Sequence, residues 1–218
     1  MITLWCRART VLASVLWLML MLASAPGRAT VIVDTFGPGD TFNPTSAWVF
    51  RGANSHTHDP GLEQGFAFTV GPTSIVLTDI YIALSYNTET HNRGDLLLMT
   101  DSAGVPDSII KSYAVRGTEE FGKDFTPTHI VDALGPTLLA DTRYWLIGSA
   151  PTDAGLYWNL NDQGISGDRA FRRPPLPFSV ADDEPLGAFR VEGTESIPEP
   201  STLALLAAGA IGLVRRRS

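Results

Sequence analysis

Short apolar runs with a two-residue repeat fill the middle of this 218-residue chain, and turn-forming residues interrupt them. In the run from Ile80 to Leu84 the three large aliphatic side chains occupy alternate positions, so a strand would place them on one face. Gly-Pro pairs at Gly37, Gly71 and Gly135 favour turns. Because no useful window outside the two termini carries a helical 3.6-residue repeat, the interior is predicted to be all-β.

Many short strands with frequent turns are typical of a β-sandwich. We predict a two-sheet, jelly-roll-like sandwich over residues 30–193. The segment Arg172–Pro185 contains four prolines and an acidic triplet, and it is predicted to be a loop crossing the surface. The expected strands are 30–36, 47–50, 65–70, 74–86, 95–100, 108–115, 128–132, 137–139, 144–149, 156–160 and 188–192.

The first 29 residues have the organisation of a secretory signal peptide. Arg7 and Arg9 precede a 13-residue apolar run, which is too short to be a transmembrane anchor. Two small-residue cleavage sites compete, one after Ala25 and one after Ala29. We expect cleavage by signal peptidase after Ala29, because the other site would leave Pro26 at the new amino terminus.

Charge and cysteine content constrain the domain between the two ends. Residues 30–197 keep 10 of the 16 Lys and Arg and 22 of the 23 Asp and Glu, a net charge of −12. This balance argues against nucleic acid and anionic membrane faces as partners. The chain's one cysteine, Cys6, lies before residue 30, so the domain is expected to fold without disulfides.

Three different segments follow the domain, after a linker that begins at residue 194. Pro198-Glu199-Pro200 is an extended hinge, since proline fixes φ and lacks an amide hydrogen. The apolar run Leu203–Val214 has 12 residues and would rise about 18 Å as a helix, against a hydrocarbon core of roughly 30 Å. Arg215-Arg216-Arg217 would hold its end on the cytoplasmic side. The alternatives are a processed signal, a permanent tail anchor and a helix packed on the domain.

The hinge is followed by a short hydrophobic helix and an arginine-rich tail, together residues 201–218, and this order resembles the PEP-CTERM sorting signal over residues 197–218. The resemblance implies export across the inner membrane of a Gram-negative bacterium, transient membrane association, and cleavage by an exosortase at or near Pro198-Glu199-Pro200. It also implies a setting in the cell envelope or the exopolysaccharide layer of a biofilm. Ile197 departs from the pattern, in which Val is commoner at this position.

The interior resembles the choice-of-anchor β-domains of exported bacterial proteins, and is nearest to the R type. The resemblance rests on sheet and turn patterns that carry no catalytic chemistry, so it implies a fold and little about activity. The segments that carry it are 74–84, 96–106, 142–147 and 188–193.

Two groups of residues are candidate metal ligands. His56 and His58 would point the same way in an extended segment, although their neighbours also suit a solvated loop. Asp101, Asp107 and the loop 87–95 offer oxygen ligands of the kind that calcium prefers, although aspartate is also a common turn former. No other cofactor is expected.

Aromatic pairs give a further candidate site. Tyr144-Trp145 and Tyr157-Trp158 could present Trp145 and Trp158 as a platform for a sugar. Neighbouring residues of a strand face opposite sides, however, so at least one of each pair is expected to pack in the core.

For catalysis the sequence offers no Gly-x-Ser-x-Gly elbow, and its carboxylates resemble turn residues more than a catalytic pair. We therefore expect a non-enzymatic exported protein, associated with extracellular polysaccharide. A carbohydrate-binding module is the alternative, and a secreted hydrolase is the third possibility.

Overall fold

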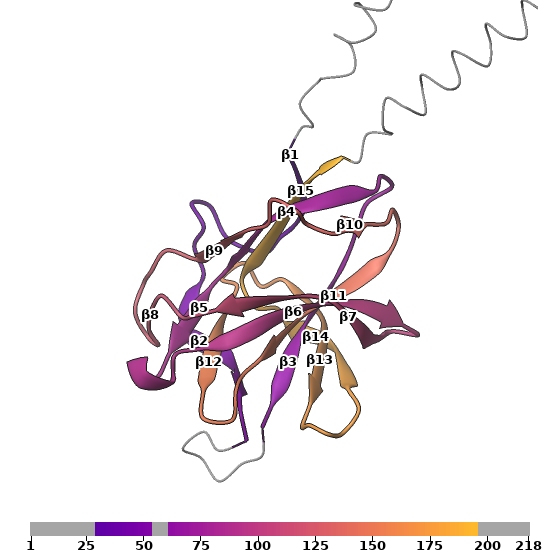
Figure 1. The fold of residues 1–218 in the computed structure, drawn as a ribbon. Helices are drawn as coiled ribbons and strands as arrows, with labels where there is room; N and C mark the ends of the chain where they lie inside the picture. The colour runs from indigo at the N-terminus through magenta and orange to yellow at the C-terminus, as the bar shows by residue number, and fades with distance from the viewer. Residues whose placement is uncertain (1–28, 54–60, 196–218) are drawn as a thin grey trace, which may run out of the picture. The chain divides into compact units, whose positions relative to one another are not determined.

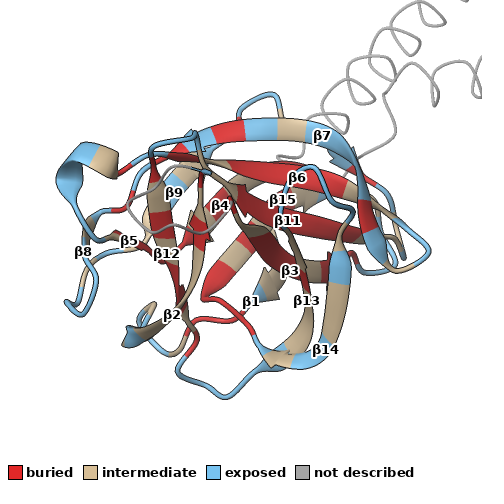
Figure 2. Ribbon diagram, turned by 90° about the horizontal axis from the view of Figure 1, so that it is seen from below, coloured by how far each residue is buried: buried red, intermediate tan, exposed pale blue. Residues whose placement is uncertain are grey.

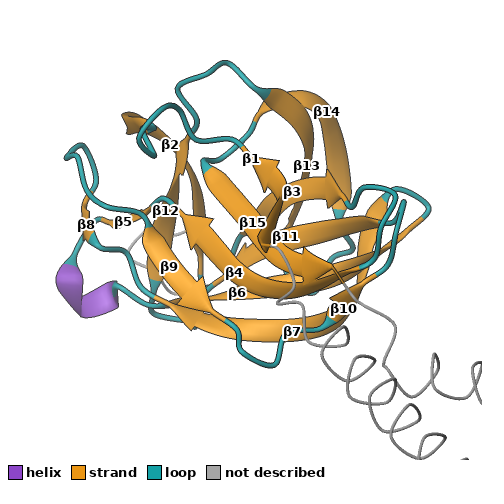
Figure 3. Cartoon of the chain, turned by 90° about the horizontal axis from the view of Figure 1, so that it is seen from above, coloured by secondary structure: helices purple, strands orange, loops and turns teal. Residues whose placement is uncertain are grey.

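The computed structural model describes residues 29–53 and 61–195 (Figure 1). Residues 29–195 form one compact unit. Within the described ranges the regular structure is strand, apart from one 3-10 helix, η1 (Glu89–His91) (Figure 3). The all-β prediction is therefore confirmed.

Six strands form the larger sheet, in the order β14-β13-β3-β11-β6-β7 with every neighbouring pair antiparallel. Its centre is rich in aromatic and branched residues, which suit a pleated surface covered on both sides. The bounds are β3 (Glu63–Thr69), β6 (Gly94–Ser102), β7 (Val105–Val115), β11 (Arg143–Ser149), β13 (Ser166–Arg172) and β14 (Ser179–Pro185).

Two smaller sheets face the six-stranded one. The five-stranded sheet has the order β1-β15-β4-β10 with β9 also on β4, and the four-stranded sheet has the order β2-β12-β5-β8. Their pairs are antiparallel except β5 with β8. The bounds are β1 (Ala29–Asp34), β2 (Asn43–Arg51), β4 (Ile75–Ile82), β5 (Leu84–Tyr86), β8 (Glu119–Glu120), β9 (Thr128–Val131), β10 (Thr137–Leu138), β12 (Gly155–Leu160) and β15 (Phe189–Glu195).

The two smaller sheets make one layer, because Ala83 alone separates β4 from β5. The Ala83 N–H donates to the carbonyl of Ala188 at 3.0 Å, and the Ala83 carbonyl accepts from the Asn159 N–H at 2.9 Å. The chain therefore passes from one ladder to the next without leaving the layer. The all-β sandwich is confirmed, but it is built from three hydrogen-bonded sheets where two were expected, and its jelly-roll-like character stays a prediction.

The main core lies between the layers (Figure 2). Trp158 of β12 is fully buried, with its ring centroid 4.8 Å from that of Phe66 of β3 and 5.8 Å from that of Phe189 of β15. Aliphatic side chains from β4, β6 and β11 complete the core around these rings. Burial of this apolar area, at about 25 cal/mol per Å², is the main stabilising term for a domain without disulfides.

The opposite face of the six-stranded sheet carries a second buried cluster. Trp145 and Ile147 of β11 lie there beside Leu97 and Met99 of β6. Phe178, just before β14, packs against this cluster. Both faces of the sheet are therefore apolar at its centre.

One prediction about the fold is wrong. The segment Arg172–Pro185 is not only a loop, since β14 occupies its second half and pairs with β13. Neither strand was expected, and nor was the two-residue β8. Both β13 and β14 are mainly half-buried or exposed, so they lack the apolar alternation that marks the other strands.

Candidate functional site

Several predicted site residues lie outside the described residues. These are the candidate metal ligands His56 and His58, the hinge Pro198-Glu199-Pro200, the apolar run Leu203–Val214 and the arginines Arg215–Arg217. Their roles stay predictions.

Ala29, the predicted cleavage position, is the first residue of β1 and pairs with Thr194 of β15. Cleavage after Ala29 stays a prediction. It would leave the rest of β1, from Thr30 onward, in its ladder with β15.

Asp101 and Asp107 both lie at the β6–β7 hairpin, but their carboxylates have different hydrogen-bond partners. The Asp101 carboxylate accepts from the Trp145 Nε1–H at 2.8 Å and from the Gly104 N–H at 3.0 Å, with Arg143 Nε at 3.4 Å. The exposed Asp107 accepts only from the hydroxyl of Ser108, at 2.9 Å, among the contacts described. Within residues 29–53 and 61–195, no three His, Cys, Asp or Glu side chains converge as a metal site would need. Calcium binding by Asp101, Asp107 and the loop 87–95 stays a prediction.

Trp145 and Trp158 are both fully buried. They belong to different clusters on opposite faces of the six-stranded sheet: Trp145 on one side, Trp158 in the main core on the other. Neither indole face is open to a sugar ring. Both tryptophans are core residues, which agrees with the expectation that at least one residue of each aromatic pair packs in the core. Tyr157 is half-buried and stacks on the exposed Phe121, with ring centroids 4.8 Å apart.

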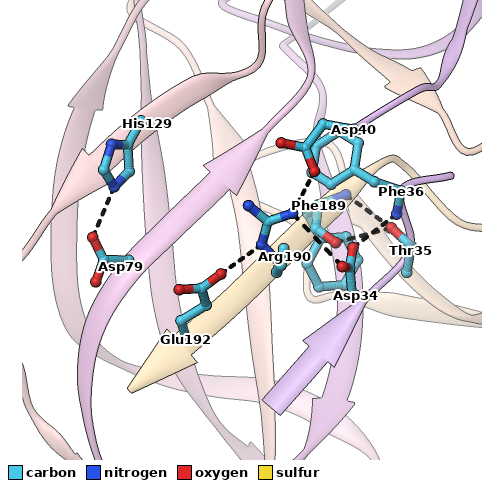
Figure 4. Close-up of polar contacts among 9 residues, drawn as sticks. All are labelled: Asp34, Thr35, Phe36, Asp40, Asp79, His129, Phe189, Arg190 and Glu192. Atoms are coloured by element: carbon cyan, nitrogen blue, oxygen red, sulfur yellow. Dashed lines mark hydrogen bonds and ion pairs between the residues drawn. The ribbon is translucent and has the colours of Figure 1, made fainter. Parts of the chain in front are cut away.

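An ionic cluster centred on Arg190 occupies the outer face of the five-stranded sheet (Figure 4). Arg190 Nε lies 2.6 Å from Glu192, its Nη1 binds Asp40, and Asp34 is 3.6 Å away. Burial disfavours the charged guanidinium, but the hydrogen bonds to Asp40 and Glu192 and the charges of Asp40 and Asp34 outweigh it and raise the pKa of Arg190. Arg190 therefore stays charged and ties the β15 strand to the turn after β1.

Thr35 also joins the segment after β1 to the start of β15, through hydrogen bonds from its side chain to the backbone. Its hydroxyl donates to the carbonyl of Gly187 at 2.9 Å. It also accepts from the Phe189 N–H at 2.8 Å (Figure 4). The first and last strands of the domain are thus fastened side by side.

A stacked row extends this cluster across the sheet. Arg190 lies over the ring of Tyr81 at 4.2 Å, and the His129 ring stacks on Tyr81 with centroids 4.2 Å apart and planes 5° apart. His129 Nε2 lies 2.7 Å from Asp79 Oδ1 (Figure 4). The row runs across three neighbouring strands, β15, β4 and β9, because Arg190 is the ladder partner of Tyr81 and Tyr81 is the ladder partner of His129.

His129 and Asp79 form a His–Asp pair within this row. A His–Asp pair can orient a proton acceptor, but a nucleophile within reach of the imidazole is also needed, and Tyr81 offers His129 its ring face. The sequence held a signal for this cluster, since Arg190 and Glu192 alternate with the buried Phe189 and Val191.

A shallow cavity of about 350 Å³ is the other candidate site. It lies where β6 begins and β7 ends, and Arg93, Asp95, Arg116 and Pro151 help to line it. The sequence analysis reached Asp95 only within the candidate calcium loop 87–95, and the cavity itself was missed because residues from three distant stretches of the chain build it.

The tail identifies the class of protein. A family model described as the PEP-CTERM protein-sorting motif matches residues 196–218. The chain therefore carries a PEP-CTERM sorting signal at residues 196–218, which supports export in a bacterium to the cell envelope or extracellular space and processing by an exosortase, a membrane protein.

The sandwich itself has no such match. No curated protein and no solved structure matches the chain. The choice-of-anchor resemblance of the interior stays a prediction. Within residues 29–53 and 61–195, no helix has the length and apolarity to cross a membrane.

Proposed function

We propose that this chain is a non-enzymatic matrix protein, whose β-sandwich associates with the extracellular polysaccharide of a Gram-negative biofilm. The observation that carries the proposal is the PEP-CTERM motif at residues 196–218, which directly follows a compact β-domain ending at Glu195. In this proposal the domain is cargo, and the motif delivers it to the envelope, where the tail is removed.

The contacts of the charged residues support a structural role for the domain. Asp101 holds a buried indole, Arg190 joins three carboxylates, and Asp132 accepts hydrogen bonds at 2.7 Å from both Lys111 and Tyr113. These contacts stabilise the sandwich, since a hydrogen bond to a charged group contributes more than one between neutral groups.

The charge of the domain fits a protein that stays dissolved between polymer chains. Net charge far from zero keeps a protein soluble and separate from its copies. With a net charge of −12 over residues 30–197, the domain is expected to avoid anionic membrane surfaces once its tail is gone.

Cosedimentation tests this proposal. The exported protein is purified and mixed with the matrix polysaccharide of the bacterium that makes it, and the polymer is then collected by centrifugation. We expect the protein to pellet with the polymer and the reducing ends of the polymer to stay constant. Protein left in the supernatant would remove polysaccharide association from the proposal, and a rise in reducing ends would replace it with the hydrolase alternative.

A further inference from the structure

The cavity lined by the start of β6 and the end of β7 is accessible from solvent. Asp95 and Ala114 are direct partners across the β6–β7 ladder. Asp95 faces away from the main core, because Leu96 beside it belongs to that core, and a Cβ on Gly94 would meet Phe50 at 2.9 Å. The cavity therefore lies at the end of the six-stranded sheet opposite the β6–β7 turn, with Asp95 on the outer face of the sheet and Gly94 and Val115 on its core side.

Hydrogen-bond donors and an acceptor face this cavity together. Arg116 is exposed, and no carboxylate in the described ranges forms an ion pair with its guanidinium. Arg93 binds Asp153 through one nitrogen and keeps further N–H groups for a ligand. Among the residues that the structure describes, Asp95 makes only a long contact of 3.5 Å with the hydroxyl of Ser112. A ligand here would meet both free N–H groups and a free carboxylate.

The rest of the lining is apolar. Ala114 and Pro151 contribute apolar surface between the charged groups, and Val115 also lines the cavity, although its side chain belongs to the main core. The volume of about 350 Å³ falls at the low end of the range of ligand sites, about 300–1,000 Å³. The cavity thus suits a small unit with a hydrocarbon face and polar edges, such as one or two sugar rings.

The charges decide which kind of sugar fits. The two arginines are balanced by Asp95 in the cavity and by Asp153 on Arg93. An acidic sugar would gain little from a site without net positive charge, and the domain's overall charge of −12 would repel an acidic polymer. A hydroxyl group both donates and accepts, so a pair of neighbouring hydroxyls satisfies arginine and aspartate together.

We infer that this cavity binds a neutral hexose unit of a polysaccharide, with Arg116 and Arg93 donating to its hydroxyl oxygens and Asp95 accepting from its hydroxyl groups. The inference rests on the proposed function and gives it a site and a ligand class. The apolar wall would carry the C–H face of the ring, as the apolar part of a ligand pocket does.

Calorimetry with matched oligosaccharides tests the inference. The exported protein is titrated with hexamers of glucan, mannan and galactan, and with the corresponding glucuronate, mannuronate and galacturonate hexamers. We expect at least one neutral hexamer to bind at least tenfold more tightly than its acidic counterpart. Tighter binding of the acidic partner, or no binding of any neutral hexamer, would overturn the inference.

Three variants locate the binding. Asp95→Asn and Arg116→Gln should each weaken binding of the neutral hexamer at least fivefold, with unchanged melting temperatures. Arg173→Gln is the matched control, because Arg173 is also exposed but lies outside the cavity lining. Equal affinity of Asp95→Asn, Arg116→Gln and the wild type would overturn the site.

The same variants separate this inference from the proposed function. If the wild type and both cavity variants pellet equally with matrix polysaccharide, association stands and the cavity is not its site. If the wild type itself does not pellet, the proposed function fails, whereas hexamer binding still reports on the cavity.

Discussion

Asp101 Oδ1 lies 2.8 Å from the indole Nε1 of Trp145, and this hydrogen bond joins the β6–β7 hairpin to the centre of the six-stranded sheet. The other Asp101 oxygen accepts from the Gly104 N–H at 3.0 Å. Ala103 and Gly104 both have positive φ, 54° and 85°, as the tight hairpin turn requires. One carboxylate therefore stabilises an unfavourable turn and satisfies a buried donor.

Removal of this carboxylate should destabilise the domain. Asp101→Ala leaves the buried Trp145 N–H without its acceptor, and we expect a loss of about 1–3 kcal/mol in the free energy of unfolding. Urea denaturation followed by tryptophan fluorescence measures it. Asp107→Ala is the control, since Asp107 is exposed on the same hairpin. Equal stability of the two variants would show that the Asp101–Trp145 contact contributes nothing.

Gly187 is needed for the packing of Trp158. A Cβ at Gly187 would lie 2.4 Å from the indole Nε1 of Trp158 and 2.7 Å from the ring of Phe66. Gly187→Ala should therefore overpack the core and lower the free energy of unfolding by about 1–3 kcal/mol. At Gly71 the same change meets no atom within 4 Å, so Gly71→Ala should leave the melting temperature within a degree or so of wild type. An unaffected Gly187→Ala protein would contradict the described packing.

Asp132 should give the domain an acid-sensitive contribution to stability. Burial raises the pKa of Asp132, but hydrogen bonds from Lys111 and Tyr113 outweigh it and lower the pKa below its ordinary value. A carboxyl group with a lowered folded-state pKa stabilises the fold fully above its unfolded pKa of about 3.9, and this contribution is lost as the pH falls through the folded value.

The pH dependence can be checked with a neutral variant. Asp132→Asn should have a lower melting temperature than wild type at pH 7, and the difference should shrink as the pH falls below about 4. Asp182→Asn, at an exposed position of β14, is the charge-matched control. A difference between Asp132→Asn and wild type that is the same at pH 7 and pH 3 would show that the Asp132 charge does not act as described.

Strands of the core were predictable because they bury one alternating set of residues. Phe189 and Val191 alternate with Arg190 and Glu192, and the structure places the first pair in the core and the second pair on the surface. The strands β13 and β14, which pair at the edge of the six-stranded sheet, lack this alternation. The outer strand β14 pairs only with β13, so its acidic residues stay solvated, and local composition then resembles a loop.

The outer face of the six-stranded sheet shows a further limit of sequence reasoning. Alternation predicts that Tyr144 and Trp145 point to opposite faces, and they do, but both faces are buried. The second cluster is covered by Phe178, which is 33 residues further along the chain than Trp145. Contacts at this separation depend on the strand order, which no local pattern specifies.

The cavity between β6 and β7 escaped prediction for the same reason. Arg93 and Asp95 are neighbours in sequence, but Arg116 and Pro151 join them only through the ladders of β7 and β11. The Arg190 cluster was easier to predict, because Arg190 and Glu192 alternate with buried residues of β15. Its partner Asp40, however, lies near the N-terminal end of the domain's sequence.

Intact-mass measurement of the protein in fractionated cells tests whether the domain is cargo of a processed sorting signal. We expect wild type to lose Arg215–Arg217 and to leave the inner membrane. Pro198→Ala combined with Pro200→Ala keeps the apolar run and the arginines but lets a helix extend backwards through Glu199. This double variant should accumulate in the inner membrane with its tail intact. Wild type that retains Ser218, or a double variant processed as efficiently as wild type, would contradict the claim and leave a plain tail anchor in its place.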